Sequence, residues 1–279
     1  MKLPIFQLDA FASQLFRGNP AAVVVLPQWL PDETLQAIAQ ENNLSETAFV
    51  LPRDECFDLR WFTPEVEVDL CGHATLASAH VLFHHGYTSS TKIVFQYQGG
   101  TLTVSREGGL LAMNFPARPP TPTQCGPAIT QALGVTPREL HQSRDLLAVF
   151  DSQADVEGLN PDLAAVSRLN TFAVITTAPG EACDFVSRFF APAKGVPEDP
   201  VTGSAHCTLV PYWSSRLRKT KLHALQLSKR GGELFCEDQG DRVKIAGRVV
   251  EYLRGEIDLQ LKPNEAAQQV AAADEPQRA

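Results

Sequence analysis

Residues 60–77 read RWFTPEVEVDLCGHATLA, and residues 188–206 read RFFAPAKGVPEDPVTGSAH. Each stretch starts with an Arg-aromatic-Phe-x-Pro strand and reaches a glycine followed by small residues that begin a helix. A doubled element of this kind predicts a molecule of two similar halves. If the halves face each other, two helix N-termini meet at one ligand, where free backbone N–H groups and the helix dipole favour an anion.

Composition narrows the class of protein. The 279 residues are 44% hydrophobic, as in a globular protein of one or two domains. The formal net charge of −8 argues against a nucleic-acid partner. No apolar run is long enough for a membrane span, and the N-terminus alternates like a strand instead of resembling an export signal. The six cysteines form no CxxC pair, so we expect reduced thiols in the cytoplasm.

The hydrophobic pattern alternates many short strands with few helices. Strands are expected at residues 4–10, 21–26, 45–51, 58–62, 91–97, 101–105 and 110–115, and again at 145–150, 169–178, 184–190, 222–228, 233–237, 242–246 and 249–261. Helices are expected at residues 31–43, 72–85, 128–133 and 203–217. The prediction is an α+β fold of two similar domains with a cleft between them.

The best domain boundary is ARPPTPTQCGP, residues 117–127, because it holds four prolines and has no periodicity. It divides the chain into an N-terminal domain of residues 1–116 and a C-terminal domain of residues 117–263, whose last strand is free to pack back on the first domain. Residues 264–279 are rich in Ala, Gln and Glu, and we expect this tail to be disordered.

Glu46 and His73 are candidates for acid–base chemistry. Glu46 precedes the apolar strand TAFVL, where partial desolvation suits a carboxyl group for this work; a solvated glutamate at a strand start is the alternative. His73 follows Gly72, where a strand turns into a helix. Because a cation opposes the helix dipole there, a neutral imidazole is favoured, and a purely structural histidine is equally consistent. A single Cys-x-His lacks companion ligands at zinc-site spacing, so no metal is expected.

Two further positions offer chemistry at the helix starts. Cys71 would act as nucleophile or base only if the helix start lowers its pKa, and an inert buried thiol is the alternative. Asp199 lies in EDPVTGS, where Gly203 permits an unusual backbone angle. Thr202 and Ser204 offer hydroxyls beside free N–H groups, as in a cradle for a carboxylate or phosphate. The alternative is that Asp199 or Thr202 only caps the helix.

Five blocks together resemble the phenazine biosynthesis PhzF family, and most closely its branch of phenazine biosynthesis-like domain-containing proteins. They are FRGNPAAVVVL at 16–26, NNLSETAFV at 42–50, RWFTPEVEVDLCGHATLASA at 60–79, RFFAPAKGVPEDPVTGSAH at 188–206 and RGGEL at 230–234. The resemblance extends from Met1 to about Leu259. It implies the diaminopimelate-epimerase-like fold, with two similar domains, each a curved, mostly antiparallel sheet around a central helix, and the site in the interdomain cleft. It also implies isomerase chemistry without metal or organic cofactor, in a homodimer.

The resemblance implies roles for individual residues as well. The glutamate of the SET block moves a proton in the phenazine enzyme, and here it is Glu46. The GHAT histidine and the aspartate and serine of DPxTGSA complete the expected catalytic set of Glu46, His73, Asp199 and Ser204. The expected substrate-binding residues are Asn19, Ser45, Gly72, Thr202 and Gly203.

The sequence departs from part of the superfamily. Diaminopimelate epimerases use one thiol from each half, and alignment of the glycine turns puts Cys71 at the first thiol but Pro200 at the second. The two-thiol mechanism is therefore excluded, while a role for Cys71 stays open. No residue matches a determinant that would fix the phenazine precursor as the substrate.

The sequence thus predicts a cofactor-independent isomerase acting on a small carboxylate-bearing metabolite, with no nucleic-acid or membrane partner. Glu46 takes a proton from a carbon beside an electron-withdrawing group and returns it elsewhere, while His73, Asp199 and Ser204 stabilise or shuttle charge. One alternative is an epimerase or racemase, which returns the proton to the same carbon. The other is a binding or scaffold protein that has kept the fold, although the retained Glu46, His73 and Asp199 weigh against it.

Overall fold

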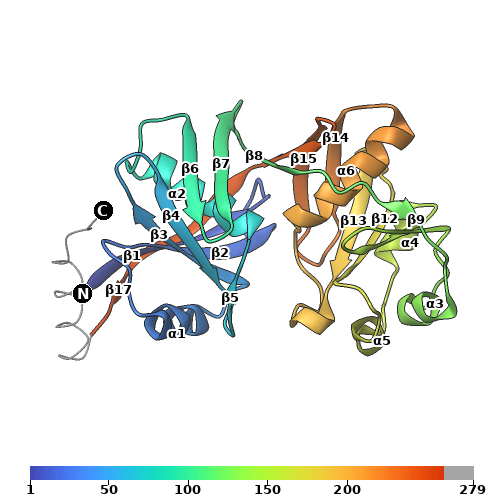
Figure 1. The fold of residues 1–279 in the computed structure, drawn as a ribbon, viewed down its shortest axis with the longest axis horizontal. Coiled ribbons are helices and arrows are strands. Elements are labelled where there is room, and N and C mark those ends of the chain that lie inside the picture. Colours follow the sequence, from blue (N-terminus) through green and yellow to red (C-terminus); the bar gives the residue numbers. More distant parts are fainter. Residues whose placement is uncertain (261–279) are drawn as a thin grey trace.

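The computed structural model describes residues 1–260, and its elements gather in two lobes (Figure 1). The first lobe contains β1 (Lys2–Ala10), β2 (Asn19–Val25), α1 (Asp32–Asn42), β3 (Glu46–Pro52), β4 (Phe57–Phe62), β5 (Glu67–Val68), α2 (Gly72–His84), β6 (Lys92–Tyr97), β7 (Gly100–Glu107) and β8 (Leu110–Pro116).

The second lobe follows in the chain, and the last strand returns to the first lobe. Its elements are β9 (Thr121–Pro122), α3 (Pro127–Leu133), β10 (Glu139–Gln142), β11 (Leu146–Val149), α4 (Gln153–Glu157), α5 (Leu163–Ser167), β12 (Val174–Pro179), β13 (Phe185–Phe190), η1 (Pro192–Lys194), α6 (Gly203–Leu217), β14 (Lys221–Gln226), β15 (Gly232–Asp238) and β16 (Arg242–Gly247). β17 (Val249–Asp258) pairs antiparallel with β1.

Hydrogen bonds join the 17 described strands into one mixed sheet, in which the same pairing order occurs twice. In the first lobe β2 runs parallel to β3, β3 antiparallel to β4, and β4 parallel to β6. In the second lobe β11, β12, β13 and β14 repeat this sequence of directions. The pairing of β8 with β16 connects the lobes. The fold is therefore α+β, as predicted, with a large mixed sheet and few helices.

The helices α2 and α6 occupy equivalent places in the two lobes. Nearly every side chain of α2 is buried, as in a helix that is covered on all sides. α6 contains Pro211, whose missing N–H leaves the Cys207 carbonyl without its helical partner. The backbone N–H of Arg118 donates to that carbonyl at 2.9 Å, so the connection from the first lobe completes the helix.

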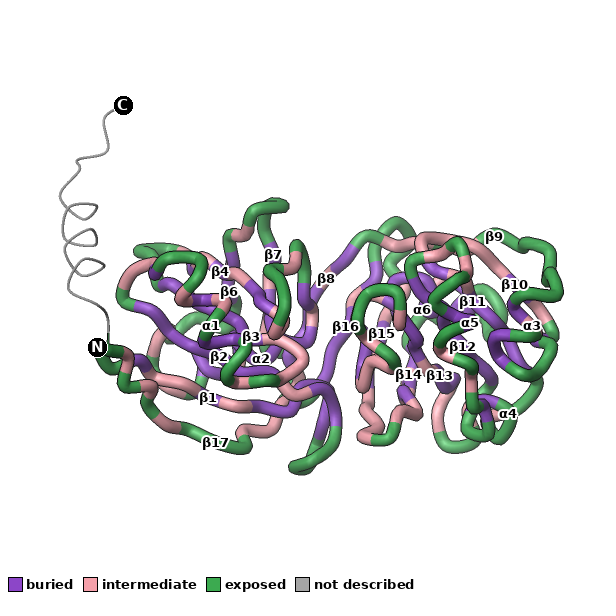
Figure 2. The backbone as a smooth tube through the Cα atoms, turned by 90° about the horizontal axis from the view of Figure 1, so that it is seen from below, coloured by how far each residue is buried: buried purple, intermediate pink, exposed green. Residues whose placement is uncertain are grey.

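The core of residues 1–260 has three parts, and many of the exposed segments are loops (Figure 2). The largest cluster surrounds α2 and α6 and includes Phe11, Trp61 and Trp213. Smaller clusters lie under α1 and under α3 to α5. Within residues 1–260 no helix has the length and apolarity needed to cross a membrane.

Several expectations need correction. Residues 153–157 and 163–167 form helices that were not predicted, although Ser152 and Asp155 make a capping box, a readable helix start. The strand expected at 169–178 begins only at Val174. Residues 117–127 include β9, which pairs with β10. The domain boundary at residue 117 stays a prediction, and the tail at 264–279 lies outside the described residues.

Candidate active site

Glu46 is the first residue of β3, and its side chain is 17% exposed. Its Oε2 atom lies 3.1 Å from Nε2 of His73, the second residue of α2. Oε2 has no hydrogen-bond partner among the described residues, so the contact is an ion pair without the alignment of a hydrogen bond. The structure therefore brings together two of the predicted catalytic residues, with a carboxylate oxygen buried against an imidazole.

His73 is 6% exposed, and its neighbours favour the charged imidazolium, which the sequence did not predict. Burial lowers its pKa, but Cys71 and Glu46 outweigh burial and hold the pKa well above its ordinary value of 6.5. Burial also raises the pKa of Cys71 to about 11, and Glu46 raises it further. The expectation of a neutral His73 was wrong because the helix dipole is weaker than a carboxylate in contact.

Cys71 is the N-cap residue of α2, and it is 5% exposed. Its Sγ lies 3.5 Å from Nδ1 of His73. Because the thiol pKa is raised, the helix start does not create a thiolate, and the structure gives no support to Cys71 as a nucleophile. Its sulfur, a ring nitrogen of His73 and a carboxylate oxygen of Glu46 all lie within 4.8 Å of one another, which is compatible with a metal ion.

Asp199 belongs to the loop before α6, and burial, two neighbouring charges and two hydrogen bonds define its state. Burial raises its pKa to about 6; His73 lowers the pKa, and Glu46 raises it. Both residues are therefore near enough for their charges to act on it. Asn19 Nδ2 donates to Oδ1 at 2.8 Å and the Thr202 hydroxyl donates to Oδ2. Asp199 is thus held next to first-lobe residues, as a site shared by both halves requires.

Neither helix start is capped by a side chain. The Thr202 hydroxyl donates its hydrogen bond to Asp199 and caps no helix N–H group. The alternative that Asp199 or Thr202 only caps α6 is therefore wrong. The first-turn N–H groups after Gly72 and Gly203 therefore remain available to an anion. Neither glycine has a positive φ, which corrects the unusual angle expected at Gly203. A Cβ at either position would meet no atom closer than 3.8 Å.

Asn19 and Gln226 hold the Asp199 loop in place. Besides its bond to Asp199, Asn19 Nδ2 donates to the Val201 carbonyl at 3.0 Å. Gln226 accepts from the Thr202 N–H at 2.8 Å and donates to the Asp199 carbonyl at 2.8 Å. Gln226 was missed by the sequence analysis. Its signal was a polar residue on the buried face of β14, in the alternation of Leu222, Ala224 and Gln226.

Ser204 and Ser45 are less closely tied to this cluster. Ser204 accepts a hydrogen bond from Arg144 Nη2 at 3.2 Å, and Arg144 is fixed by a bidentate pair with the buried Asp145. No hydrogen bond or ion pair joins Ser204 to Glu46 or His73 in the described chain. Ser45 is partly buried, and its side chain makes no hydrogen bond within residues 1–260.

Arg144 is a second residue that the sequence analysis missed. The repeated pairing makes the start of β11 the counterpart of the start of β2, where Asn19 lies. By the same register, the residues before β12 correspond to the start of β3, where Glu46 lies. Phe172 precedes β12, and the Arg144 guanidinium stacks over its ring at 4.3 Å. The starts of β2 and β3 thus carry Asn19 and the carboxyl group of Glu46, whereas the equivalent positions before β11 and β12 carry the cation Arg144 and the ring of Phe172.

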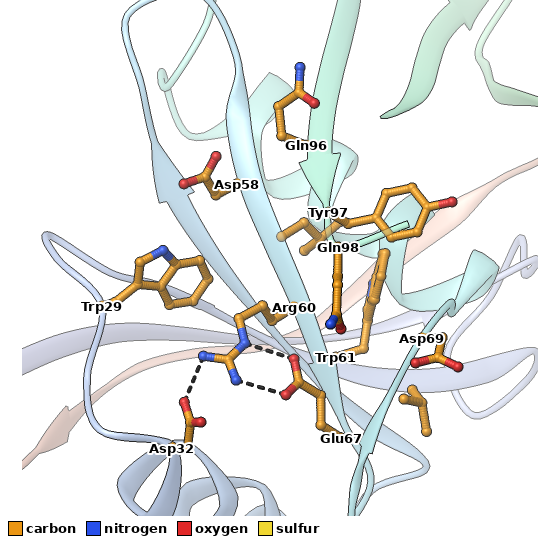
Figure 3. A pocket seen from close by; sticks show the side chains of 12 residues that line it. Trp29, Asp32, Asp58, Arg60, Trp61, Glu67, Asp69, Gln96, Tyr97 and Gln98 are labelled. Atoms are coloured by element: carbon orange, nitrogen blue, oxygen red, sulfur yellow. Dashed lines mark hydrogen bonds and ion pairs between the residues drawn. The ribbon is translucent and has the colours of Figure 1, made fainter. Parts of the chain in front are cut away.

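The larger cavities lie beside this cluster or away from it. A cavity of about 280 Å³ between Phe11, Arg17, Gln226 and Gly231 adjoins the Asp199 loop through Gln226. A larger one, of about 600 Å³, lies at the edge of β4, and its Arg60 pairs with Glu67 and Asp32 (Figure 3). None of the predicted site residues lines that larger cavity.

Comparison with known proteins gives consistent results. The sequence model of the family described as phenazine biosynthesis-like protein matches residues 8–255. An uncharacterized isomerase of Pseudomonas aeruginosa is 52% identical over 260 residues, covering 93% of this chain and 100% of that protein. A PhzF-family phenazine biosynthesis protein of Enterococcus faecalis superposes with a TM-score of 0.91 at 45% identity, covering 93% of this chain and 100% of that chain. A hydroxyproline epimerase of Agrobacterium vitis, at 11% identity and a TM-score of 0.60, covers 95% of this chain and 94% of its own, and is alike in fold alone.

Proposed function

The chain belongs to the family of phenazine biosynthesis-like proteins and is an isomerase, and from that premise we propose that it shifts a proton on a small carboxylate-bearing metabolite without a cofactor. The observation that carries the proposal is Glu46 Oε2, which is buried against His73 and accepts no hydrogen bond in the described chain. A carboxylate oxygen with no hydrogen bond to give up can accept a proton from a substrate carbon placed beside it.

The proposed reaction uses groups from both halves. Glu46 takes the proton from a carbon beside an electron-withdrawing group. The imidazolium of His73 then compensates negative charge, and Asp199, with a pKa of about 6, takes up or releases a proton near neutral pH. The developing enolate is stabilised by fixed N–H donors, which need no reorganisation during the reaction.

The substrate carboxylate would lie between the two helix starts. The N–H groups that follow Gly72 and Gly203 are free of side-chain caps. Because Ser204 accepts from Arg144, its own hydroxyl hydrogen is free to donate to an oxygen of the substrate. Ser45 would border the substrate beside Glu46, and Thr202 would contribute by fixing Asp199. The N–H groups after Gly203 and the Ser204 hydroxyl are all hydrogen-bond donors. The second-lobe side therefore suits a ligand rich in acceptors, such as a carboxylate.

We further propose that this site is a cleft between two similar domains, residues 1–116 and 117–263. The hydrogen bond of 2.8 Å from Asn19 to Asp199 supports it, since these residues come from the two halves of the chain. A homodimer and a cytoplasmic location are also proposals, resting on the family resemblance and the cysteine usage. Sedimentation equilibrium tests the dimer, which should give twice the chain mass of 30.5 kDa.

An epimerase remains the second candidate, and one observation favours it. Glu46 and Asp199 are carboxyl groups from different halves that act on each other electrostatically. Such a pair can remove a proton on one face of a carbon and return it on the other. Product stereochemistry separates this reaction from a shift to another carbon.

Proton exchange in deuterated water tests the function. A panel of amino acids and unsaturated acids is incubated with the protein, and loss of carbon-bound proton signals is followed by NMR. We expect exchange for at least one compound, and a loss of at least about 100-fold in Glu46→Gln, as for removal of a general base. Glu55→Gln, on an exposed turn, is the matched control. No exchange with any compound, or equal rates for Glu46→Gln and wild type, would contradict the proposal.

If wild type exchanges nothing, the scaffold alternative is tested by pull-down. A protein partner that still binds the double variant Glu46→Gln, Asp199→Ala would show that binding needs neither carboxyl group.

A further inference from the structure

Glu46, Cys71 and His73 place three metal-ligating atoms of different chemistry around one point. The carboxylate oxygen, the sulfur and a ring nitrogen lie within 4.8 Å of one another. We propose that these three side chains form a binding site for a thiophilic divalent cation, Zn²⁺ in the first place, and that the bound ion blocks the enzyme reversibly.

The distances fit a tetrahedral zinc ion after a small adjustment. Zinc bonds of about 2.0–2.3 Å to nitrogen, oxygen and sulfur put neighbouring ligand atoms about 3.4–3.6 Å apart. In the structure His73 Nε2 lies 3.1 Å from Glu46 Oε2 and 4.0 Å from Cys71 Sγ. The Glu46 oxygen and the Cys71 sulfur lie within 4.8 Å of each other, so movements of up to about 1 Å, within reach of side-chain torsions, bring all three atoms to the zinc distances. A water molecule would complete the tetrahedron.

The backbone around the three ligands is already ordered. Cys71 has the extended conformation of an N-cap residue, and the Thr75 hydroxyl donates to its carbonyl at 2.6 Å. His73 lies in the first turn of α2, and Glu46 begins a strand paired on both sides. Little conformational entropy is left to lose when an ion binds.

The charges also favour a cation. His73 is the only ion-pair partner of Glu46 in the described chain, and no lysine or arginine reaches that carboxylate. Asp199 adds a second carboxyl group near enough to interact with both Glu46 and His73. The α2 N-terminus opposes a cation with about half a positive charge. The two carboxylates, together with the Cys71 thiolate that forms as the metal binds, outweigh it.

The sequence alone argues against this site because Cys-x-His has no third ligand at the usual spacing. The third ligand comes from β3, which the sheet places beside the start of α2. Binding would use the thiolate, the neutral imidazole and the carboxylate. The thiol proton and the imidazolium proton would therefore pass to solvent as the metal bonds form.

The inhibitory consequence rests on the proposed function, whereas metal binding does not. An ion bound to Glu46 and His73 occupies the proposed base and the imidazole that compensates charge. Exchange of substrate protons should then stop while the ion is bound and return after chelation.

Cobalt is the probe, since Co²⁺ takes zinc sites and bonds to thiolate give a charge-transfer absorption in the near ultraviolet. The full-length protein is treated with chelator, titrated with Co²⁺ under reducing conditions without thiol reagents, and then titrated with Zn²⁺ by calorimetry. We expect one ion per chain and a thiolate band that Zn²⁺ abolishes. Cys71→Ser should lose the band and bind at least about tenfold more weakly, and Glu46→Gln should keep the band but bind more weakly.

Cys125→Ser is the matched control, because Cys125 is exposed and distant in sequence from the cluster. Circular dichroism and a thermal melt verify that each variant folds, and Cys71→Ala serves if Cys71→Ser does not. Absence of a thiolate band in wild type, or a band unchanged in the Cys71 variant, overturns the site. Metal binding without any proton exchange in the metal-free protein would leave the site standing and refute the proposed function. Exchange that Zn²⁺ leaves unaffected would refute the inhibition.

Discussion

At the scale of single residues, two carboxyl groups from the two halves differ in what surrounds them. Glu46 faces a histidine and keeps one oxygen without a donor. Asp199 receives hydrogen bonds from Asn19 and Thr202 on both oxygens, and burial still raises its pKa to about 6. Desolvation thus exceeds the stabilisation from two donors, which leaves Asp199 able to exchange a proton near neutral pH.

The charge on His73 should depend on Glu46. Replacing the carboxylate in Glu46→Gln removes the negative charge at 3.1 Å, while burial continues to disfavour the cation. We therefore expect the pKa of His73 to fall, and the imidazole to become neutral at a lower pH than in wild type. NMR of histidine labelled with ¹⁵N measures this titration. Glu55→Gln should leave it unchanged, and an unaltered His73 titration in Glu46→Gln would contradict the ion pair.

Asp199 should make the protein less stable as the pH rises. Its folded pKa of about 6 lies above the ordinary 3.8, so the folded state binds the proton more tightly. The stability from the protonated form is complete below about pH 4 and is lost as the pH rises through about 6. The difference between the folded and the ordinary pKa of Asp199 corresponds to about 3 kcal/mol of stability at most, and the partial exposure of the residue reduces this contribution.

Asp199→Asn cannot ionise and should escape this loss. Urea unfolding at about pH 4 and about pH 7.5 measures the free energy of unfolding of the variant and of wild type. The variant's value relative to wild type should rise by about 1–3 kcal/mol from the lower to the higher pH. The Thr202 hydroxyl can turn to accept from the new amide, so the hydrogen bonds survive. Asp54→Asn, on an exposed turn, should show no such gain. A difference that does not change with pH would disprove the desolvated state of Asp199.

At the scale of elements, close packing against β15 fixes the loop that carries Asp199. Val201 is fully buried, accepts from Asn19 through its carbonyl, and lies directly against Gly232. A Cβ at Gly232 would overlap the Val201 side chain and approach the Phe11 carbonyl to 3.2 Å. The glycine is therefore needed for close approach, since its φ is not positive.

Gly232→Ala should destabilise the protein by about 1–3 kcal/mol, the usual cost of overpacking a core position. Because Val201 must move, the Asn19 bonds to Val201 and Asp199 should weaken too, and proton exchange should slow more than stability alone explains. Urea unfolding and the exchange assay measure the two effects. Gly126→Ala is the control, since nothing lies within 4 Å of a Cβ there. Equal behaviour of the two variants would refute the contact.

The elements were largely predictable where a local signal determines them. α6 runs from Gly203 to Leu217 as predicted, because the glycine turn and the apolar spacing both mark it. α2 likewise begins at Gly72. The two residues of β5 and the short α4 and α5 are below the length at which periodicity is visible.

The site was predictable in its residue types but not in its electrostatics. Glu46, His73 and Asp199 were identified from motifs, yet the charge of His73 depends on a contact between β3 and α2 that no local pattern reports. The third metal ligand was missed for the same reason. Gln226 had a local signal, its polar side chain on a buried strand face, and it went unused.

At the scale of the whole molecule, one contact region aligns the two lobes next to the site. The segment after β1 lies against the start of β15, where Gly18 N–H donates to the Gly231 carbonyl at 2.7 Å. Arg230 donates to the Gly18 carbonyl at 2.8 Å and to Asp9 Oδ1 at 2.7 Å. Asn19 follows Gly18 directly, so Arg230 fixes the residue that bonds Asp199.

Arg230→Gln should therefore affect stability and chemistry together. Asp9 is 3% exposed, and without the guanidinium the N–H of Phe16 is the one hydrogen-bond donor that its carboxylate keeps within residues 1–260. We expect the free energy of unfolding to fall by about 2–3 kcal/mol. This value lies between the usual cost of breaking an exposed ion pair and that of breaking a buried one. Amide hydrogen exchange at residues 16–19 should quicken, and substrate-proton exchange should slow because Asn19 no longer holds Asp199 towards His73. Arg53→Gln, which breaks an exposed pair with Asp58, should cost at most about 1 kcal/mol and leave both rates unchanged. If Arg230→Gln destabilises the protein but exchanges substrate protons at the wild-type rate, Arg230 does not set the position of Asn19.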